Sequence, residues 1–478
     1  MILSDKKKCH FSYTANNESC NKCKVPSGNN SRSSPPKLSA KETGKIALWQ
    51  IKKVLNSHFP DLSSRLNAME DNRERERYTV EELVLGGLML FLLKQKSRNS
   101  MDNLRRQEDF SKNYYRAFKR RCPSMDAVED FYRILEPKEL EDLKAQLIAR
   151  LIDKRVFHRF RLMGKYFVVA VDATGVHSSS RLYWKECTKK ESCSGKITCM
   201  SNVLEAKLIC SNGLSLSICS EWIVNPVDEV YDKQDCEQKA FKRLSVRLKE
   251  YFPRLPLCLV FDGLYCNGPV MDICQDNDWN WIAVFKDGSL PSVHLELDLL
   301  PDGAFSRQCR LMPHRKMEEK YTWCNQLDYG NRKIHWLECL ENKKKKDGSY
   351  EKHHFQYLTN ILQDGETAVA CVYYARKRWN IEESFNDQKN RDFAMQHLFS
   401  RHSFTSFANW YQTLQLAYNI YMFVVKSVEM VELVKSSGKL TICAIWSDLV
   451  GMLKFIDITD IITEFDHWIA SPRQVRLC

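Results

Sequence analysis

Glycine and proline are scarce in this chain of 478 residues, which contains 17 glycines and 14 prolines. Collagen-like and Pro/Gly-rich low-complexity proteins are thereby excluded. Long hydrophobic runs are also missing. The most apolar stretch, residues 83–93, falls well short of the ~20 residues that a membrane-spanning helix needs. We interpret it as a buried helix and expect no membrane partner.

The sequence has no recognisable secretory features. Lys6, Lys7 and Lys8 are not followed by an apolar run, so we expect no signal peptide. The 19 cysteines are odd in number and lack the dense, regular spacing of a disulfide scaffold. These features predict a cytoplasmic protein with reduced thiols.

What is present is a globular composition with a basic excess. Hydrophobic residues make up 44% of the chain, and 72 basic against 60 acidic side chains give a net charge of +12. An excess of this kind suits a polyanionic partner such as nucleic acid, although it also serves solubility alone.

The N-terminal part divides into a tail and a helical region. Residues 1–43 are rich in Ser, Asn, Lys and Pro, which predicts a flexible basic tail. Residues 44–160 show helical periodicity, and Thr79 with Glu82 forms a predicted capping box. The helical region is either a DNA-binding unit or a solvated helical bundle. Its basic residues include Arg105, Arg106, Lys119, Arg120 and Arg121.

From residue 165 the pattern changes to alternating strands and helices. A hairpin is expected around Asn212-Gly213, and residues 289–365 are expected to be β-rich. This element order predicts an α/β (α+β) fold: a ribonuclease-H-like mixed sheet with helices on both faces. The expected strands are 166–171, 203–209, 214–223, 257–261 and 281–285, and the expected helices are 232–251, 270–274, 376–391 and 404–425.

Two acids follow predicted central strands. Asp172 ends the strand 166–171, and Asp262 ends the strand 257–261. Open α/β sheets place their sites at this edge, and if the strands are neighbours the two carboxylates converge. Oxygen ligands of this kind favour Mg²⁺ or Mn²⁺. Each acid, considered alone, is also an ordinary turn residue.

The helix 376–391 supplies a third acid. Arg378, Glu382 and Lys389 are spaced by four and seven residues, so they share one helical face. Glu382 would complete a site for two metal ions, and Arg378 and Lys389 would contact DNA phosphates. Lys286, after the strand 281–285, is a further candidate for phosphate contact. The alternative to roles in binding metal and phosphate is that Arg378 and Glu382 form an ordinary structural ion pair. Glu383 should point away from this face.

Arg378, Glu382 and Lys389 resemble the signature of the Tyr-Arg-Glu-Lys (YREK) group of DDE transposases. The pattern departs at its Tyr position, where this chain has Ala375 beside Tyr374. The segments VVAVDATGV (168–176), LVFDGLYCNG (259–268) and WIAVFKDGS (281–289) are similar to the family's two Asp blocks. The resemblance covers residues 80–425.

The resemblance implies DNA cleavage at the ends of an insertion sequence and strand transfer into target DNA, with Mg²⁺ or Mn²⁺ at Asp172, Asp262 and Glu382 and a homodimer at paired ends. It implies a bacterial, nucleoid-associated protein. A nuclease without strand transfer and a domesticated, inactive DNA-binding derivative are the alternatives. The expected domains are a tail (1–43), a helical DNA-binding region (44–160), the catalytic domain (161–288 and 366–425), a β-rich insertion (289–365) and C-terminal helices (426–478).

Other residues have weaker patterns. Cys9, His10, Cys20 and Cys23 have partial zinc-ligand spacing, whereas Cys187, Cys193 and Cys199 match no common zinc pattern. For Trp323 and Trp336, core packing is favoured over stacking on a flipped base. His353 and His354 are interpreted as structural, and Lys343–Lys346 is either a phosphate contact or a solvated hairpin tip.

Overall fold

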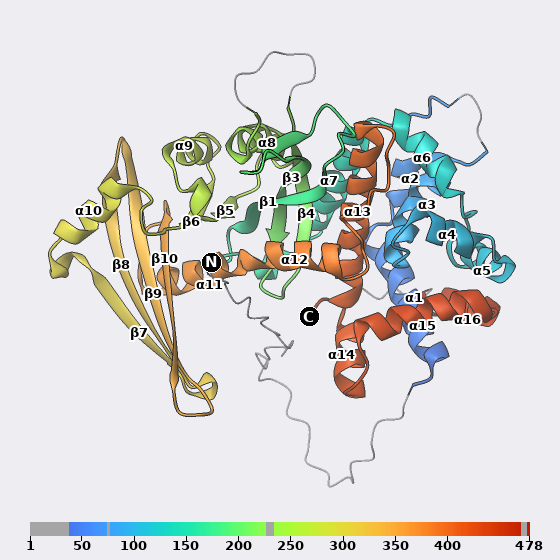
Figure 1. The fold of residues 1–478 in the computed structure, drawn as a ribbon. Coiled ribbons are helices and arrows are strands. Elements are labelled where there is room, and N and C mark those ends of the chain that lie inside the picture. The colour runs from blue at the N-terminus through green and yellow to red at the C-terminus, as the bar shows by residue number, and fades with distance from the viewer. Residues whose placement is uncertain (1–37, 74–76, 226–233, 470–475) are drawn as a thin grey trace, which may run out of the picture. The chain divides into compact units, whose positions relative to one another are not determined.

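The computed structural model describes residues 38–73, 77–225, 234–469 and 476–478 (Figure 1). Most of the predicted tail and the candidate zinc residues Cys9, His10, Cys20 and Cys23 therefore lie outside the described residues. Within the described ranges, no helix combines the length and the apolar character needed to cross a membrane.

The chain begins with a bundle of helices, as predicted from residue 44 onward. The side chain of Thr79 accepts a hydrogen bond from the backbone of Glu82, and Glu82 returns one to Thr79, so the predicted capping box is present. Three of the predicted basic residues are ion-paired: Arg105 with Asp102, Arg120 with Glu81 and Arg121 with Glu82. The helices are α1 (Ala40–His58), α2 (Leu62–Asn67), α3 (Val80–Leu92), α4 (Arg98–Arg105), α5 (Glu108–Phe118), α6 (Met125–Ile134) and α7 (Pro137–Asp153).

A mixed β-sheet follows the bundle. Its central order is β4-β3-β1-β5-β6, in which β1 is antiparallel to β3 and parallel to β5. This arrangement is consistent with the predicted ribonuclease-H-like fold. The predicted hairpin is present, and Gly213 has a φ of +85° in its turn. The strands are β1 (Phe167–Ser179), β2 (Thr188–Glu191), β3 (Ile197–Ile209), β4 (Ser215–Ile223), β5 (Leu257–Phe261) and β6 (Asn280–Val284).

The sheet continues without interruption into the segment predicted to be β-rich. β10 pairs with β6, and β9, β8 and β7 extend the same sheet outward. The segment also contains a helix, α10 (Pro291–Leu299), which the sequence analysis missed. The added strands are β7 (Ser306–Met312), β8 (Met317–Tyr329), β9 (Arg332–Lys344) and β10 (Tyr350–Thr359).

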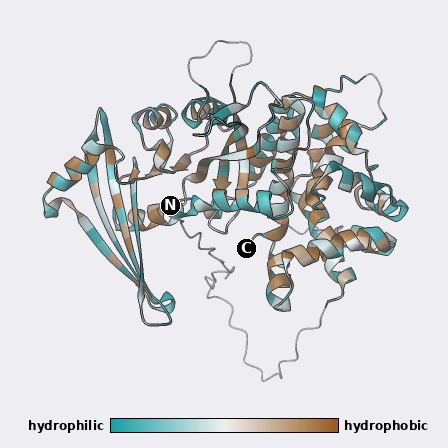
Figure 2. Ribbon diagram, viewed as in Figure 1, coloured by the Kyte–Doolittle hydropathy of each residue, from teal (hydrophilic) through white to brown (hydrophobic). Residues whose placement is uncertain are grey.

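Helices cover both faces of the central sheet. Val169 and Leu259 pack toward α8 (Glu237–Tyr251), whereas Val168 and Cys258 pack toward α11 (Gly365–Lys377) and α12 (Trp379–Asn390). Hydrophobic residues concentrate on these strands and on α13 (Phe404–Val425), which passes through the middle of the helical part (Figure 2). The remaining helices are α9 (Gly268–Asp276), α14 (Val428–Ser437), α15 (Ile442–Phe455) and α16 (Thr459–Ile469).

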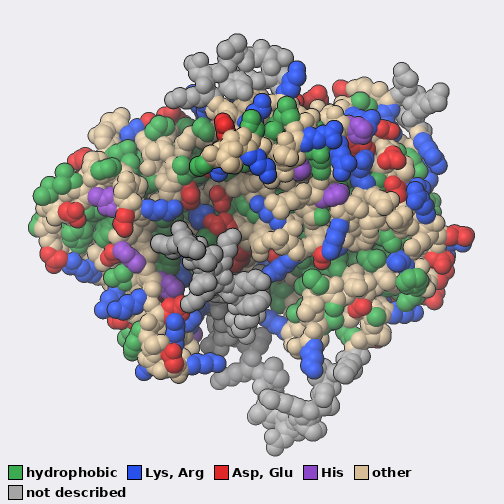
Figure 3. Space-filling model, viewed as in Figure 1, with side chains coloured by type: hydrophobic (Ala, Val, Ile, Leu, Met, Phe, Trp, Pro, Cys, Tyr) green, Lys and Arg blue, Asp and Glu red, His purple; other side chains and the backbone are tan. Residues whose placement is uncertain are grey.

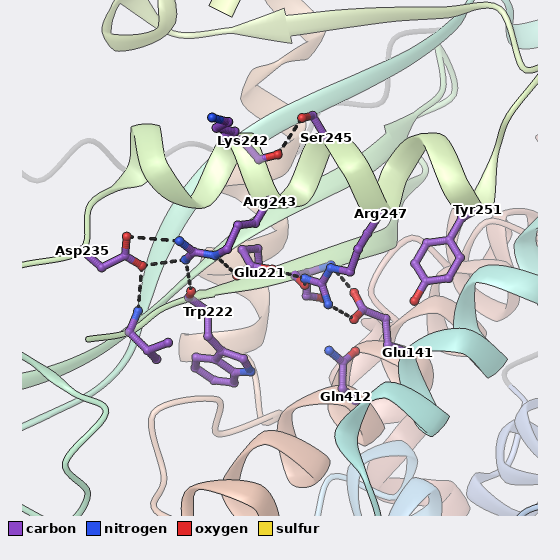
Figure 4. Close-up of polar contacts among 12 residues, drawn as sticks. Glu141, Glu221, Trp222, Asp235, Lys242, Arg243, Ser245, Arg247, Tyr251 and Gln412 are labelled. Atoms are coloured by element: carbon purple, nitrogen blue, oxygen red, sulfur yellow. Dashed lines mark hydrogen bonds and ion pairs between the residues drawn. The ribbon is translucent and has the colours of Figure 1, made fainter. Parts of the chain in front are cut away.

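A network of charges fixes α8 to the sheet and to the N-terminal bundle (Figure 4). Arg247 of α8 donates to Glu141 of α7 at 2.6 Å and also pairs with Glu221. Arg243 pairs with Glu221 and Asp235. Glu141 is buried, and the nearby charges of Lys144 and Arg247 both favour its ionised form. The network therefore ties the N-terminal bundle to the sheet that carries the candidate site.

Three predicted element boundaries were wrong. Asp172 does not end its strand, because β1 continues to Ser179 through pairing with β3. The residues between the predicted strands 166–171 and 203–209 also contain β2 and the start of β3. The predicted helix 376–391 is divided at Arg378, the residue between α11 and α12.

Candidate active site

Asp172 lies on β1, and Asp262 directly follows β5, the parallel neighbour of β1. The ladder pairs Phe167 with Leu257 and Ala170 with Val260. The same offset, continued by two residues, aligns Asp172 with Asp262. Neighbouring strands are ~4.8 Å apart, so the two carboxylates emerge side by side. The two strands are neighbours, which is the condition under which the two carboxylates were expected to converge.

The helix α12 brings Glu382 to these acids. Ile381 and Phe385 are buried in the same apolar cluster as Val168 and Ala170 of β1, so this face of α12 packs on the sheet. Glu382, next to Ile381, is partly exposed at the rim. Glu383 is exposed, and its charge acts on Lys426 rather than on the aspartates. The predicted divergence of the two glutamates is present.

Arg378 connects two of the acids. Its Nη2 donates to Oε1 of Glu382 at 2.7 Å, and its Nη1 lies 3.7 Å from Oδ2 of Asp172. The side chain of Arg378 is 12% exposed, so this ion pair is shielded from bulk water. Since the guanidinium contacts acids on two separate elements, the pair is more than a local helix contact.

The electrostatics of Asp172 reflect this convergence. Burial raises the pKa of Asp172 to about 6, Arg378 opposes the rise, and the charges of Glu382 and Asp262 add to it. Two like charges close to an acid disfavour its ionised form. The three acids predicted from sequence thus lie close enough to interact electrostatically.

Two lysines lie near the acids: Lys389 interacts with Asp172, and Lys286 lies beside Gly263. Burial lowers the pKa of Lys389, and the negative charge of Asp172 opposes that shift. A Cβ built on Gly263 would lie 3.0 Å from Cδ of Lys286, so the lysine chain lies across the residue that follows Asp262. Both predicted phosphate-contact residues are therefore placed beside the acids.

The carboxylates suit a hard cation chemically, because each is an oxygen donor and their mutual repulsion would be relieved by positive charge. In the described parts of the chain, however, no three acidic, histidine or cysteine side chains stand close enough together to hold one ion. The guanidinium of Arg378 lies between Asp172 and Glu382. Holding an ion between these acids therefore requires the Glu382 carboxylate to turn away from Arg378.

A cavity of about 500 Å³ adjoins the site. Trp379 lies in its wall with a side chain that is 57% exposed. Other lining residues are Lys286, His354, Tyr357, Arg376 and Arg378. An exposed indole among cations is suited to stacking on a base while the phosphates are neutralised.

Tyr374 does not substitute for the missing signature tyrosine. Its hydroxyl donates to the backbone oxygen of Phe160 at 2.6 Å, and its ring is buried. Ala375 is also buried. The tyrosine in the cavity wall is Tyr357 on β10. Burial raises the pKa of its hydroxyl, and the positive charges of Arg376 and Arg378 oppose that rise.

A fourth carboxylate, missed in the sequence, lies near Asp262. Glu237 is the first residue of α8 and accepts a hydrogen bond from the Tyr265 hydroxyl at 3.1 Å. Burial raises the pKa of Glu237, the Tyr265 hydrogen bond opposes this, and the charge of Asp262 raises it further. The only indication of this role in the sequence was the position of Glu237 near the start of the helix that precedes β5.

The remaining candidates are structural in this arrangement. Trp323 and Trp336 are both less than 10% exposed and pack in the apolar clusters, as favoured from sequence. His354 contacts Glu338 at 2.7 Å and His353 contacts Glu351 at 3.5 Å. Cys187 and Cys199 are buried and Cys193 is exposed.

Residues 231–420 match the family model of the transposase DDE domain. The matched segment contains Asp262 and Glu382 and begins after Asp172. The match supports a DDE transposase. No curated protein matches the chain.

Proposed function

We propose that the chain is the transposase of an insertion sequence of the YREK group, which cuts DNA at the ends of the element and joins them to target DNA. One observation carries this proposal: the charges of Asp262 and Glu382 act on Asp172, and Arg378 links Asp172 to Glu382. The match of residues 231–420 to a transposase DDE domain supports the same reading.

In this proposal Asp172, Asp262 and Glu382 hold two Mg²⁺ or Mn²⁺ ions. Such ions, when bound, activate a water or 3′-hydroxyl and stabilise the leaving oxygen of a phosphodiester. Although burial raises the pKa of Asp172 to about 6, its carboxylate is ionised near neutral pH and could act as a ligand. Glu382 would hold an ion only after releasing its contact with Arg378.

The cations around the acids would position the DNA. Lys389, Lys286 and, once released from Glu382, Arg378 would each contact backbone phosphates near the cut. Trp379 would stack on a base at the exposed end of the strand. Arg376 is less available because it pairs with buried Glu341.

The wider assembly follows from the same proposal. Paired ends would be held by a homodimer, and residues 44–160 would contribute further DNA contacts, although three of their basic residues are ion-paired. The DNA substrate would place the protein in the cytoplasm, at the nucleoid.

The test is cleavage of DNA carrying the ends of the source element in the presence of Mg²⁺. Asp262→Asn should bind this DNA as wild type does yet fail to cut it. Asp276→Asn, which changes an exposed acid on α9, is the matched control and should cut normally. Equal cutting by wild type and Asp262→Asn would refute the assignment.

The products separate the alternatives. Cutting followed by joining to a second duplex is the expected result. Cutting without joining would identify a nuclease, and binding without cutting by the wild type would identify an inactive DNA-binding derivative.

A further inference from the structure

Two hairpin turns at the outer end of the sheet bring their basic residues together. One turn, Pro313–Arg315 followed by Lys316, joins β7 to β8, and the other joins β9 to β10. The backbone N–H of Lys344 donates to the carbonyl of Lys316 at 2.9 Å, so the two turns are in direct contact. The sequence shows the run Lys343–Lys346, but only the sheet pairing adds Arg315 and Lys316 to it.

Six basic residues of these two turns are exposed, and we call them the hairpin-tip cluster: Arg315, Lys316, Lys343, Lys344, Lys345 and Lys346. Within the ranges that the structure describes, none of them forms a salt bridge with a carboxylate. The acid of the same turn, Asp347, accepts two hydrogen bonds from Ser349. In the space-filling view, Lys and Arg side chains gather at the lower end of the extended sheet, where Figure 1 places these turns (Figure 3).

The strand β10 connects this cluster to the candidate active site. Tyr357 of β10 lines the cavity beside Arg378, and Tyr350 begins the strand next to the tip. Seven residues of strand span about 23 Å at ~3.3 Å per residue. One turn of B-DNA is ~34 Å long. A duplex whose end lies at the cavity can therefore reach the tip within its first turn.

The side chains along the way favour a polyanion. Lys352 of β10 is exposed between the tip and the cavity. Tyr350, also exposed, offers a hydroxyl that can donate to phosphate. The cations of the hairpin-tip cluster form no salt bridge in the described residues, whereas Arg105, Arg120 and Arg121 of the helical bundle are each paired with an acid.

We propose that the hairpin-tip cluster is a second DNA-contact surface, which binds the phosphate backbone of a duplex within one helical turn of the cut. The inference rests on the proposed transposase function and extends it to the placement of the duplex. Transposon-end DNA and target DNA share the phosphate chemistry, and the experiment below distinguishes them.

The test compares two variants of the full-length protein. Arg315→Ala/Lys316→Ala removes two cations from the tip, and Lys333→Ala/Lys439→Ala removes two exposed cations elsewhere. Lys333 lies at the opposite end of the β8–β9 hairpin, where it pairs with Asp328. Binding to a 40-base-pair duplex is measured from low to moderate salt. Each lost phosphate contact should reduce the slope of log K against log salt by ~0.9.

The tip variant should lose about one to two units of slope, and the control variant should match wild type. Substituting Lys343–Lys346 by Ala should lower the slope further. An unchanged slope in both tip variants would overturn the inference. Circular dichroism of each variant excludes loss of the fold as the cause.

Cleavage and joining then identify which DNA is held. A tip variant that cuts element ends poorly places end DNA on the cluster, whereas one that cuts normally but joins poorly places target DNA there. If the wild type neither cuts nor joins while the salt dependence changes as expected, the proposed function fails and the DNA-contact surface stands. If the wild type cuts and joins, and the tip variants do so equally with unchanged binding, the surface fails alone.

Discussion

Arg378 and Asp172 face each other across the boundary between α12 and β1, with Nη1 of Arg378 at 3.7 Å from Oδ2 of Asp172. The arginine thereby offsets part of the charge that three acids bring to one rim of the sheet. Its guanidinium occupies the space between Asp172 and Glu382 into which a divalent ion would be drawn.

Replacing Arg378 should shift the pH dependence of cleavage. Burial already raises the pKa of Asp172 to about 6, and Arg378 holds it below the value that burial and the neighbouring acids would give. Arg378→Gln should therefore raise this pKa further, and the acid limb of the pH–rate profile should move to higher pH. For each unit by which this pKa rises, the rate well below pH 6 should fall about tenfold, whereas a one-unit rise lowers the ionised fraction at pH 7 only about twofold.

The control for this change is Arg391→Gln, which alters a cation at the end of α12 that pairs with Asp387. Its profile should match wild type. A lower rate in Arg378→Gln with an unmoved acid limb would mean that Arg378 contacts DNA without tuning Asp172.

Trp379 should matter for DNA and little for stability. Its indole is 57% exposed, so Trp379→Ala loses little buried surface. Stacking on one base contributes ~1–3 kcal/mol, so affinity for a frayed DNA end should fall about 5- to 150-fold. Trp379→Phe should retain part of this affinity. Fluorescence anisotropy with a labelled end duplex measures the effect.

Phe455→Ala provides the comparison, because Phe455 is 75% exposed on α15. It should bind DNA as wild type does. Equal affinity of Trp379→Ala and Phe455→Ala would exclude stacking by Trp379.

Glu237 should act as a positioning residue for the loop after Asp262. Glu237→Gln keeps an acceptor for the Tyr265 hydroxyl but removes a charge that interacts with Asp262. The cleavage rate should fall about tenfold, the size of effect expected from a small misplacement of the reacting groups, with DNA affinity unchanged. Tyr265→Phe should have a similar effect, because the hydroxyl that orients Glu237 is lost.

Glu250→Gln, at an exposed position near the end of the same helix, should leave the rate unchanged. Single-turnover kinetics separate the rate from binding. If Glu237→Gln behaves as Glu250→Gln does, the fourth carboxylate has no part in the site.

The sequence predicted those features that depend on local pattern. Apolar runs located β1 and β5, and their ends located Asp172 and Asp262. Asn212-Gly213 located the hairpin, where the positive φ of Gly213 suits a residue without a side chain. The spacing of Arg378 and Glu382 allowed a structural ion pair as the alternative to roles in binding phosphate and metal, and that ion pair is present at 2.7 Å.

Features that depend on distant pairing could not be predicted in this way. The polar half of β1 is a strand because β3 pairs with it. Tyr357 and Trp379 reach one cavity only because β10 joins β6 at the edge of the central sheet. The direction of Tyr374 depends on the carbonyl of Phe160, which lies in the segment before β1.

Lys207 makes the free energy of unfolding depend on pH in the alkaline range. Its ammonium is fully buried beneath α12, where it donates to Ser384 Oγ at 2.9 Å. Burial lowers the pKa of Lys207 from 10.5 to about 8; Glu205 and Asp387 oppose this shift, and Lys144 adds to it. Between these two values the unfolded chain binds a proton that the folded chain has released, so the free energy of unfolding rises with pH.

The variant Lys207→Met lacks this dependence. Below pH 8 the wild type carries the full cost of burying the Lys207 charge. The difference in free energy of unfolding between Lys207→Met and wild type therefore favours the variant most in that range. It should shrink by about 3 kcal/mol as the pH rises from 8 to 10.5. Ser384 keeps its hydrogen bond to the carbonyl of Ile381, so the change leaves no unpaired hydroxyl. Thermal denaturation of both proteins across this range measures the difference, with exposed Lys439→Met as control. Parallel curves for wild type and Lys207→Met would show that Lys207 stays charged in the folded protein, held by Glu205 and Asp387.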